Sequence, residues 1–492
     1  MRTTPTLAAL TLAAGLASAA DYDVPGPSGE SLKYYLESPL SPIAAGDTLI
    51  LHDTGSYQTT YTVSDANLTI KAAPGQTIAL DGQFAGTVLD VQADNLTLER
   101  LTLRGGLAAI DGGAIRCLSH NLTIRDCLFE GNIAPDDGGA IVFSDATLLV
   151  EDCNFTGNST QGSTSESAGG AIQTVRGNIT LRRCTFTGNS AVYAGGALHI
   201  ADTDARYCIE DCAFSDNTAN FGGAVWWTSA AEGDVFDSTF DANTAAIDGG
   251  AVYHNSAPAT YTRCVFTHNK TEGPNADDAG AVYVHGETTN EVELYSCLLA
   301  HNTAASNGGA LVFDTGPDSK LYNCTVADNT ALGANSAVGG GAAFTLGNGA
   351  TPFFRNCIVR GNAPDQFAGP TNLQHSNVEG GAGTGVIDAD PLFLNPATLD
   401  YRLADASPSI DAGDTSWYAA APAPTDLDAN PRAVTASASP AGTPLLGLYV
   451  DQGAYEFQPA TVSSCPGDAD GNGILNLDDI NVFANSFLSG CP

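Results

Sequence analysis

The stretch that sets the fold reads Cys153-Asn-Phe155-Thr-Gly-Asn158, and its next copy reads Cys184-Thr-Phe186-Thr-Gly-Asn189. The second half of this motif, an apolar residue followed three positions later by Asn, occurs nine times. The nine copies end at Asn132, Asn158, Asn189, Asn217, Asn243, Asn269, Asn302, Asn329 and Asn362. A Gly-Gly-Ala triplet accompanies the copies, with a degenerate Ala-Gly-Ala at Ala279, and successive triplets start 26 to 32 residues apart. A near-constant period of this length indicates a solenoid.

Each repeat alternates with a period of two and has no helical stripe. The residue after each triplet is aliphatic, at Ile115, Ile141, Ile172, Leu198, Val225, Val252, Val282, Leu311 and Ala343. Another short strand lies upstream, as in Asn121-Leu-Thr-Ile124, and its apolar phase is offset from that of Cys127 and Phe129. A corner must therefore separate the two strands. Three short strands per repeat predict a parallel β-helix whose coils stack at about 4.8 Å.

Two columns explain the choice of residues at the stacked positions. Asn closes the second strand in all nine copies, because it tolerates left-handed backbone and its amide can bond along the stack. Cys begins that strand in eight copies, with Ser238 in the ninth; the eight are Cys127, Cys153, Cys184, Cys212, Cys264, Cys297, Cys324 and Cys357. Parallel Cβ vectors give poor disulfide geometry, so we expect a reduced ladder in the core. A redox or metal array is the alternative.

The combination of Gly-Gly-Ala-Ile with Phe-x-x-Asn resembles the repeat of polymorphic outer-membrane proteins, within the right-handed β-helix (pectin-lyase-like) superfamily. The resemblance covers roughly residues 100 to 365. It implies an all-β, right-handed, single-stranded parallel β-helix that is exposed at a cell surface, and some members of the family act as adhesins. No C-terminal membrane barrel of the autotransporter type is visible in the sequence.

Composition and the N-terminus predict an exported protein. The 492 residues include 18 Lys and Arg against 55 Asp and Glu, a formal net charge of −37. This charge argues against nucleic acid or anionic lipid as a partner. Residues 1–20 contain Arg2, an apolar run from Leu7 to Leu16 and small residues at Ala17 to Ala20, the pattern of a secretory signal. No later stretch is apolar enough for a transmembrane helix. We expect a monomer that is secreted or held at the cell envelope.

Besides the signal and the repeats at residues 96–375, the sequence contains three further segments. Residues 21–95 are expected to cap the rod and form its first coils, with a short capping helix over Ser31 to Ser38. Residues 376–460 contain Asp388-Ala-Asp-Pro, Ser407-Pro-Ser-Ile-Asp and Asp451-Gln-Gly-Ala-Tyr. This series resembles the tail of secreted proteins described as choice-of-anchor Q, which implies a segment that closes the β-helix and precedes a surface anchor.

The last module, residues 465–492, follows the EF-hand pattern. Counted from Asp468, oxygen ligands fall at positions 1, 3, 5, 9 and 12 and Gly473 at position 6. The expected Ca²⁺ ligands are Asp468, Asp470, Asn472, the Ile474 carbonyl, Asn476 and Asp479. The loop resembles a single dockerin repeat, whereas dockerins normally carry two. In an exported protein, Cys465 and Cys491 on either side of the loop are expected to form a disulfide.

No complete catalytic constellation is found in the sequence. Asp111 and Asp137 precede Gly-Gly on adjacent coils, as do Asp248 and Asp278, and stacking could bring each pair within about 5 Å, as in retaining glycosidases. Ordinary Asp-Gly turn chemistry or Ca²⁺ binding explains them better. The histidines show no metal-ligand spacing, and no Ser-His-Asp order is present. Two function classes remain: a non-enzymatic surface protein for adhesion, carbohydrate or partner binding, or a polysaccharide lyase or glycoside hydrolase.

One column offers a candidate binding surface. The second residue after each triplet should point outward, and five of the six members from His199 onward carry rings. This candidate stripe comprises His199, Trp226, Tyr253, Tyr283 and Phe344. Flat rings on a rigid strand face suit stacking on a sugar ring or anchoring a protein partner. The alternative is that loops or the tail cover the stripe and make it a second core.

Overall fold

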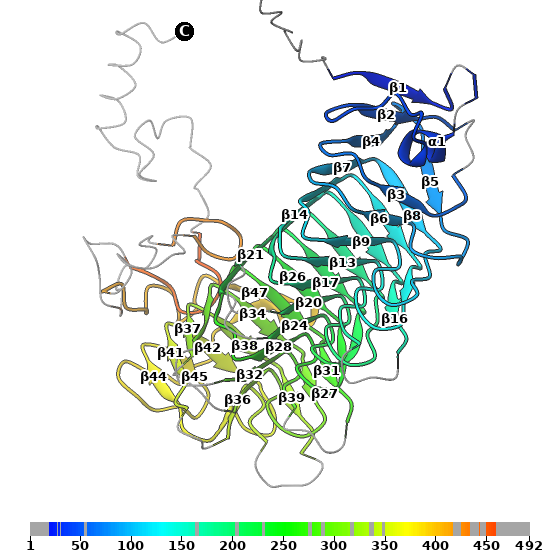
Figure 1. Cartoon of the computed structure of the whole chain (residues 1–492). Helices are drawn as coiled ribbons and strands as arrows, with labels where there is room; N and C mark the ends of the chain where they lie inside the picture. The colour runs from blue at the N-terminus through cyan, green and yellow to red at the C-terminus, as the bar shows by residue number, and fades with distance from the viewer. Residues whose placement is uncertain are drawn as a thin grey trace, which may run out of the picture.

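The computed structural model describes residues 19–458, except residues 27, 30, 54–56, 163–166, 202–205, 229–231, 274–277, 287–290, 315–318, 334–338, 347–349, 417–424, 433–441 and 443–448. Residues 1–18 and the module at 465–492 lie outside the described part. The described chain winds into a rod of stacked coils with its first strands at one end (Figure 1). The predicted parallel β-helix is confirmed: most coils contribute one strand to each of three long sheets, which contain 14, 12 and 12 strands.

Sheet A contains β1 (Asp21–Val24), β2 (Thr48–Leu51), β4 (Thr69–Ala72), β7 (Leu96–Glu99), β10 (Leu122–Arg125), β14 (Thr147–Glu151), β18 (Asn178–Arg182), β21 (Arg206–Glu210), β25 (Glu232–Phe236), β29 (Ala259–Thr262), β33 (Val292–Tyr295), β37 (Lys320–Tyr322), β41 (Phe353–Arg355) and β44 (Asn372–Gln374). Sheet B contains β3 (Tyr61–Val63), β6 (Leu89–Val91), β9 (Ile115–Leu118), β13 (Ile141–Ser144), β17 (Ile172–Val175), β20 (Leu198–Ala201), β24 (Val225–Thr228), β28 (Val252–Asn255), β32 (Val282–His285), β36 (Leu311–Phe313), β40 (Ala343–Thr345) and β43 (Phe367–Ala368).

Sheet C contains β5 (Ile78–Asp81), β8 (Leu101–Arg104), β11 (Leu128–Glu130), β15 (Asn154–Thr156), β19 (Thr185–Thr187), β22 (Ala213–Ser215), β26 (Thr239–Asp241), β30 (Val265–Thr267), β34 (Leu298–Ala300), β38 (Thr325–Ala327), β42 (Ile358–Arg360) and β45 (Asn377–Val378). A fourth set of short strands runs along one corner: β12 (Ile133–Ala134), β16 (Ser159–Thr160), β23 (Thr218–Phe221), β27 (Thr244–Asp248), β31 (Lys270–Thr271), β35 (Thr303–Ala304) and β39 (Thr330–Ala331). Neighbouring strands in these sheets are parallel, and in sheets A, B and C they stay in register with the repeat, so that Phe155 pairs with Phe186; the β23–β27 pair of the fourth set shifts its register between Ala219 and Phe221.

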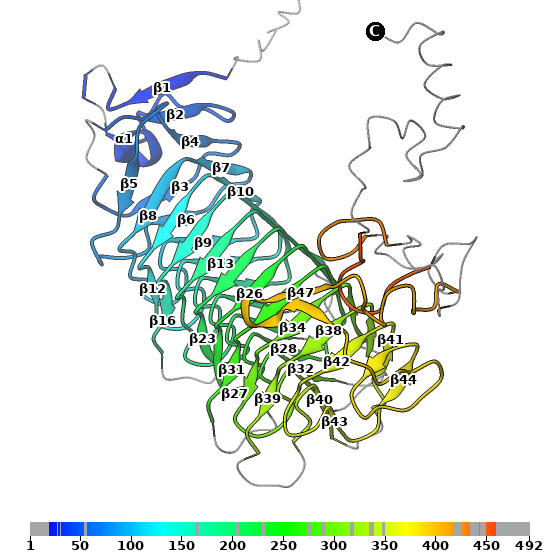
Figure 2. The same cartoon turned by 180° about the vertical axis from the view of Figure 1, so that it is seen from behind.

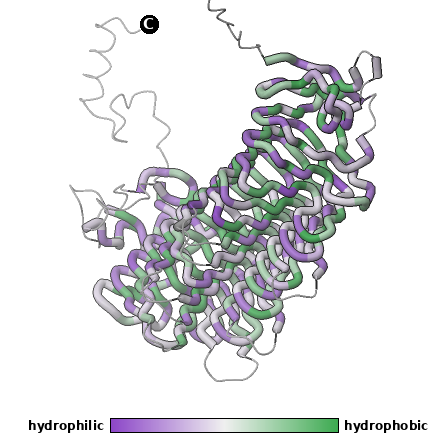
Figure 3. The backbone as a smooth tube through the Cα atoms, in the orientation of Figure 1, coloured by the Kyte–Doolittle hydropathy of each residue, from purple (hydrophilic) through white to green (hydrophobic). Residues whose placement is uncertain are grey.

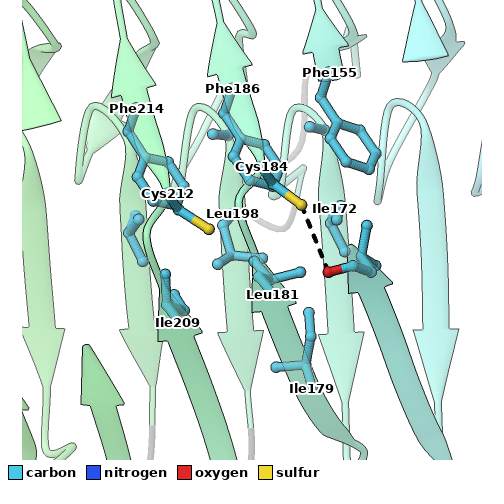
Figure 4. Close-up of a cluster of buried hydrophobic side chains, with 14 of the residues drawn as sticks. Phe155, Ile172, Ile179, Leu181, Cys184, Phe186, Leu198, Ile209, Cys212 and Phe214 are labelled. Atoms are coloured by element: carbon cyan, nitrogen blue, oxygen red, sulfur yellow. Dashed lines mark hydrogen bonds between the residues drawn. The ribbon is translucent and has the colours of Figure 1, made fainter. Parts of the chain in front are cut away.

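The inside of the rod is filled by columns of like residues, and the hydropathy colouring shows the apolar strands along its length (Figure 3). Six Phe rings, from Phe129 to Phe266, stack face to face with centroids 4.6–4.9 Å apart. All eight ladder cysteines are buried and free. Each thiol donates to the carbonyl two residues before it at 3.1–3.5 Å, and Cys184 also lies 3.6 Å from the Val150 oxygen (Figure 4). The described cysteines therefore agree with the reduced ladder.

The asparagine column forms a continuous buried ladder. From Asn132 to Asn329, each Nδ2 donates to the Oδ1 of the Asn on the next coil at 2.9–3.1 Å. The same Oδ1 also accepts the backbone N–H of the preceding Asn, as in Asn158 to Asn189. The expected bonding along the stack is confirmed, but the left-handed backbone is not at Asn. It belongs to the residue before it, such as Gly157 or His268.

The two glycines of each triplet are needed for different reasons. The first, as at Gly169, has a φ of +65°, which is the left-handed region that favours glycine. A Cβ on the second, Gly170, would lie 2.0 Å from the Gly196 oxygen of the next coil. The triplet therefore turns the chain toward the next strand of sheet B, at a point where neighbouring coils lie too close together for a Cβ atom.

The N-terminal end is capped as the sequence predicts. Helix α1 (Leu32–Glu37) starts at Ser31, whose hydroxyl accepts from the Tyr34 N–H, and ends at Ser38. Its buried residues Leu32 and Leu36 join the main core beside β3. Within the described residues, no helix has the length and apolarity needed to cross a bilayer.

The tail lies along the flank of the rod. Residues Thr384 and Ile387 bridge to the last coil, but β46 (Phe393–Asn395), η1 (Pro396–Thr398) and β47 (Asp400–Leu403) return along sheet C (Figure 2). Tyr401 packs on Leu298, Ala300 and Ala327. The outward residues of sheet C, partly or fully exposed through β26, are buried on β34 and β38, where the tail covers them.

A buried arginine fastens the tail to the rod. The Arg432 guanidinium is 1% exposed and donates to the Gly453 and Ala454 carbonyls at 2.9 and 2.6 Å and to the Ser296 hydroxyl at 3.0 Å. Its charge is balanced by Glu456, with Nη1 3.7 Å from Oε2. A buried charge is tolerated only when paired and hydrogen-bonded in this way.

Candidate binding face on sheet B

The candidate stripe is one column of sheet B. His199 on β20 pairs in register with Trp226 on β24, and Trp226 pairs with Tyr253 on β28. The register continues to Tyr283 on β32 and, through Val312 on β36, to Phe344 on β40. The first and third residues after each triplet point inward, as expected from the aliphatic column; Val225 and Trp227, for example, are both buried.

The stripe is covered along much of its length. His199 is 7% exposed and Tyr283 is 2% exposed, and Tyr283 packs in a small apolar cluster with Ala279 and Val312. Trp226, Tyr253 and Phe344 are partly buried and reach the surface. The face available to a partner is thus narrower than the sequence suggests, and it centres on Trp226 and Tyr253.

Two further rings hold this pair, and the sequence analysis missed both. Tyr193, from the turn before β20, meets Trp226 edge to face at 5.4 Å, and Phe221, at the end of β23, meets Tyr253 at 5.5 Å. Tyr193 and Phe221 also contact each other at 5.4 Å. The missed signal is a ring just upstream of the triplet: Phe221 stands immediately before its triplet, where other coils have Asp, Ala, Asn or Gly, and Tyr193 stands two residues before its own. We call Tyr193, Phe221, Trp226 and Tyr253 the ring cluster.

The histidine under the ring cluster is a packing element. His199 stacks on Trp226 with centroids 4.4 Å apart and planes 17° apart, and its ring nitrogens contact Gln173 and Thr228. Burial lowers the pKa of His199 to about 3, so the imidazole is neutral under the conditions in which most proteins work. His199 orients the indole and supplies no charge.

The stacked aspartates serve as caps between coils. Asp111 accepts the backbone N–H of Asp137 at 3.2 Å, and Asp137 accepts that of Ala168 at 3.2 Å. In the second pair, Asp248 accepts the N–H of Asp278 at 2.9 Å. Burial raises the pKa of Asp111, which its bond to the Asp137 N–H partly offsets. This geometry agrees with turn chemistry, the reading that the sequence favours.

Coil stacking brings two other histidines together beside the tail. His268 and His301 lie on adjacent coils with ring centroids 5.7 Å apart and planes 8° apart. They line a cleft of about 420 Å³ with Ala397, Thr398 and Leu399. Nearly parallel rings on successive coils cannot both direct a lone pair at one metal ion. Among the described residues, no group of three or more His, Cys, Asp or Glu side chains is arranged to hold a metal.

The remaining predicted sites lie outside the described residues. These are the calcium loop from Asp468 to Asp479 and the Cys465–Cys491 disulfide. The ten cysteines that the structure describes are all free, and Cys208 alone among them is partly exposed.

Comparisons with known proteins bear on the fold. No curated protein matches the chain significantly. A solved alginate lyase complex is 12% identical with a TM-score of 0.41, covering 72% of this chain and 82% of that one. A mannuronic acid specific polysaccharide family 6 lyase from human gut microbiota is 13% identical with a TM-score of 0.40, covering 75% and 88%. At these TM-scores the overlays carry no argument about activity.

A family match agrees with the architecture. Residues 113–294 match the family model described as "Right handed beta helix region". These residues fall in the middle of the solenoid, whose sheets B and C each hold 12 strands. The central coils of this chain are thus similar to a right-handed β-helix region.

Proposed function

We propose that the protein is a secreted or surface-displayed β-helix protein that binds a carbohydrate or protein partner through sheet B and catalyses no reaction. The observation that carries the proposal is the ring cluster. Trp226 and Tyr253 reach the surface from adjacent strands, and edge contacts from Tyr193 and Phe221 fix both rings. Rings held in place lose little side-chain entropy when a ligand stacks on them.

The alternative, a polysaccharide lyase or glycoside hydrolase, has less support. Such chemistry needs a carboxylate pair or a base within hydrogen-bond reach of a substrate pocket. Upstream of sheet B, Asp111 and Asp248 accept hydrogen bonds from backbone N–H groups, and within sheet B the side chains of His199 and His254 are buried. Burial lowers the pKa of His254 to about 3. The imidazole forms a hydrogen bond with the Tyr261 hydroxyl inside the core.

The terminal segments supply the setting for this function. We infer export from the signal at residues 1–20, and Ca²⁺ binding by Asp468, Asp470, Asn472, Ile474, Asn476 and Asp479. Calcium should act locally, because its ligands come from one short loop. Chelation with EDTA should leave the circular dichroism of the rod nearly unchanged and increase proteolysis of residues 465–492. Collapse of the rod on chelation would contradict this assignment.

Binding and catalysis can be tested together. Purified protein is incubated with a panel of surface polysaccharides and with intact cells, and both retained protein and newly formed reducing ends are measured. We expect retention without new reducing ends, and loss of retention in the Trp226→Ser, Tyr253→Ser double variant. The matched control is Tyr322→Ser, which alters a ring stacked on Tyr295 at 5.1 Å in sheet A. Release of reducing ends in proportion to enzyme would support the hydrolase or lyase instead.

A further inference from the structure

The charges around the ring cluster restrict what can bind there. The twelve strands of sheet B contain one basic residue other than His, Arg116 on β9, and its guanidinium is 3.3 Å from Asp90. Arg116 is also four strands away from Trp226 along the sheet. No Lys or Arg therefore stands on the described strands that carry the ring cluster or on their neighbours in sheet B.

Imidazoles do not supply the missing positive charge. His199 is neutral and buried beneath Trp226, and His254 points into the core. His285, at the end of β32, already contacts the Asp314 carboxylate through Nδ1. A negatively charged ligand would find no unpaired cation on these strands.

The exposed polar groups beside the rings are neutral. Thr228 and Asn255 end β24 and β28 next to the rings and are partly exposed. Asp248 and Asp278, just before the triplets that lead into β28 and β32, are buried and face no ligand. Hydroxyl and amide groups can donate to and accept from a sugar hydroxyl. The net charge of −37 would repel a uronate or a sulfate.

We propose that the ligand of the ring cluster is a neutral polysaccharide, whose sugar rings stack on Trp226 and Tyr253 while its hydroxyls bond to Asn255 and Thr228. This inference rests on the proposed function and narrows it to one ligand class. It excludes the acidic polysaccharides, such as alginate and polygalacturonate, as ligands of this face.

The test compares neutral and acidic polymers at two salt concentrations. Insoluble cellulose, chitin and mannan serve as neutral probes, and immobilised alginate and polygalacturonate as acidic ones. Screening at about 1 M salt shortens the Debye length to about 3 Å, so binding that depends on charge changes strongly and stacking does not. We expect retention on at least one neutral polymer, with affinity nearly independent of salt, and none on the acidic polymers at low salt.

Variants separate the possible failures. Trp226→Ala with Tyr253→Ala should weaken retention at least about tenfold, whereas the Tyr322→Ala control in sheet A should keep it, with thermal unfolding as the check on folding. Retention on alginate that is lost in the double variant would overturn the neutral-ligand inference and leave the proposed function standing. Failure of the wild-type protein to be retained on any polymer or cell would contradict the proposed function itself. Retention that the double variant keeps would overturn the assignment to the ring cluster.

Discussion

The Nδ2 of Asn158 donates to the Oδ1 of Asn189 at 3.0 Å, although 31 residues separate them in the chain, and both side chains are fully buried. The Asn158 backbone N–H also donates to the same oxygen at 3.0 Å. One amide thus satisfies two donors of the coil before it. Because each amide bonds to the next, the ladder can be buried as a continuous polar column in a rod whose interior otherwise holds apolar residues such as Phe, Ile and Leu.

Replacing a ladder amide should therefore destabilise the rod strongly. In Asn189→Ala, two buried donors on Asn158 and the Phe155 carbonyl lose their partner. Each orphaned buried group costs about 1–3 kcal/mol, so we expect a loss of about 3 kcal/mol or more in the free energy of unfolding. Urea titration followed by circular dichroism measures it. The exposed Thr187→Ala should change this energy by less than about 0.5 kcal/mol; equal effects would contradict the ladder's role.

The tail should detach when its buried arginine is removed. In Arg432→Met, Glu456 loses its nearby cation and two carbonyls lose their donor. Removing one partner of a buried pair costs about 3–5 kcal/mol. Limited proteolysis should then cleave residues 390–458 rapidly while the rod resists. The control is Arg402→Met, whose guanidinium pairs on the surface with Asp400 at 2.7 Å. Unchanged cleavage in Arg432→Met would show that packing alone holds the tail.

Docking of the tail should also weaken as pH rises. Burial raises the pKa of Asp451 to about 7, an effect partly offset by the hydrogen bonds that its carboxylate accepts from the backbone N–H groups of Asp411 and Phe457. A carboxyl whose pKa is higher in the folded state binds more protons in that state. Its contribution to the stability of the docked tail is therefore full below its unfolded pKa and is lost as the pH rises through the folded pKa of about 7. The loss is on the order of a few kcal/mol.

Hydrogen exchange in residues 449–457, corrected for intrinsic rates, measures this change between pH 5 and pH 8. We expect faster exchange at pH 8 in the wild type and a flatter profile in Asp451→Asn. Equal protection at both pH values in the wild type would contradict the prediction.

The thiols should react in the order of their burial. Cys208 is partly exposed, and the ladder thiols are buried, which raises the pKa of Cys297 and Cys357 well above the usual value. An aromatic disulfide reagent should label Cys208 first in the folded protein and all ten described cysteines after unfolding. Cys208→Ser should abolish the first phase. Mass spectrometry should find a disulfide between Cys465 and Cys491. Disulfides between ladder cysteines would contradict both the reduced ladder and the prediction that Cys465–Cys491 is the disulfide of this protein.

Period and alternation in the sequence were sufficient to predict the coils and the inward columns. Neighbours along one strand, or one repeat apart, determine these features. The tail contacts were not predicted, because Tyr401 and Leu298 are far apart in sequence and share no period. A signal was present: the outward position of sheet C changes from Asn154 and Thr185 to Leu298 and Ile358, where the tail lies. The burial of Tyr283 agrees with the alternative stated from the sequence, that neighbouring segments cover part of the stripe, but the periodic pattern does not indicate which rings are covered.

Hydroxyl-radical footprinting tests most directly whether sheet B is the binding surface. The protein is oxidised with and without a saturating neutral polysaccharide that retains it, and side-chain oxidation is read by mass spectrometry. We predict that oxidation of Trp226 and Tyr253 falls when the ligand covers their rings, while oxidation of Tyr322 on sheet A is unchanged. Protection of Tyr322, or of His268 and His301 beside the tail, with Trp226 and Tyr253 oxidised as before, would contradict the account.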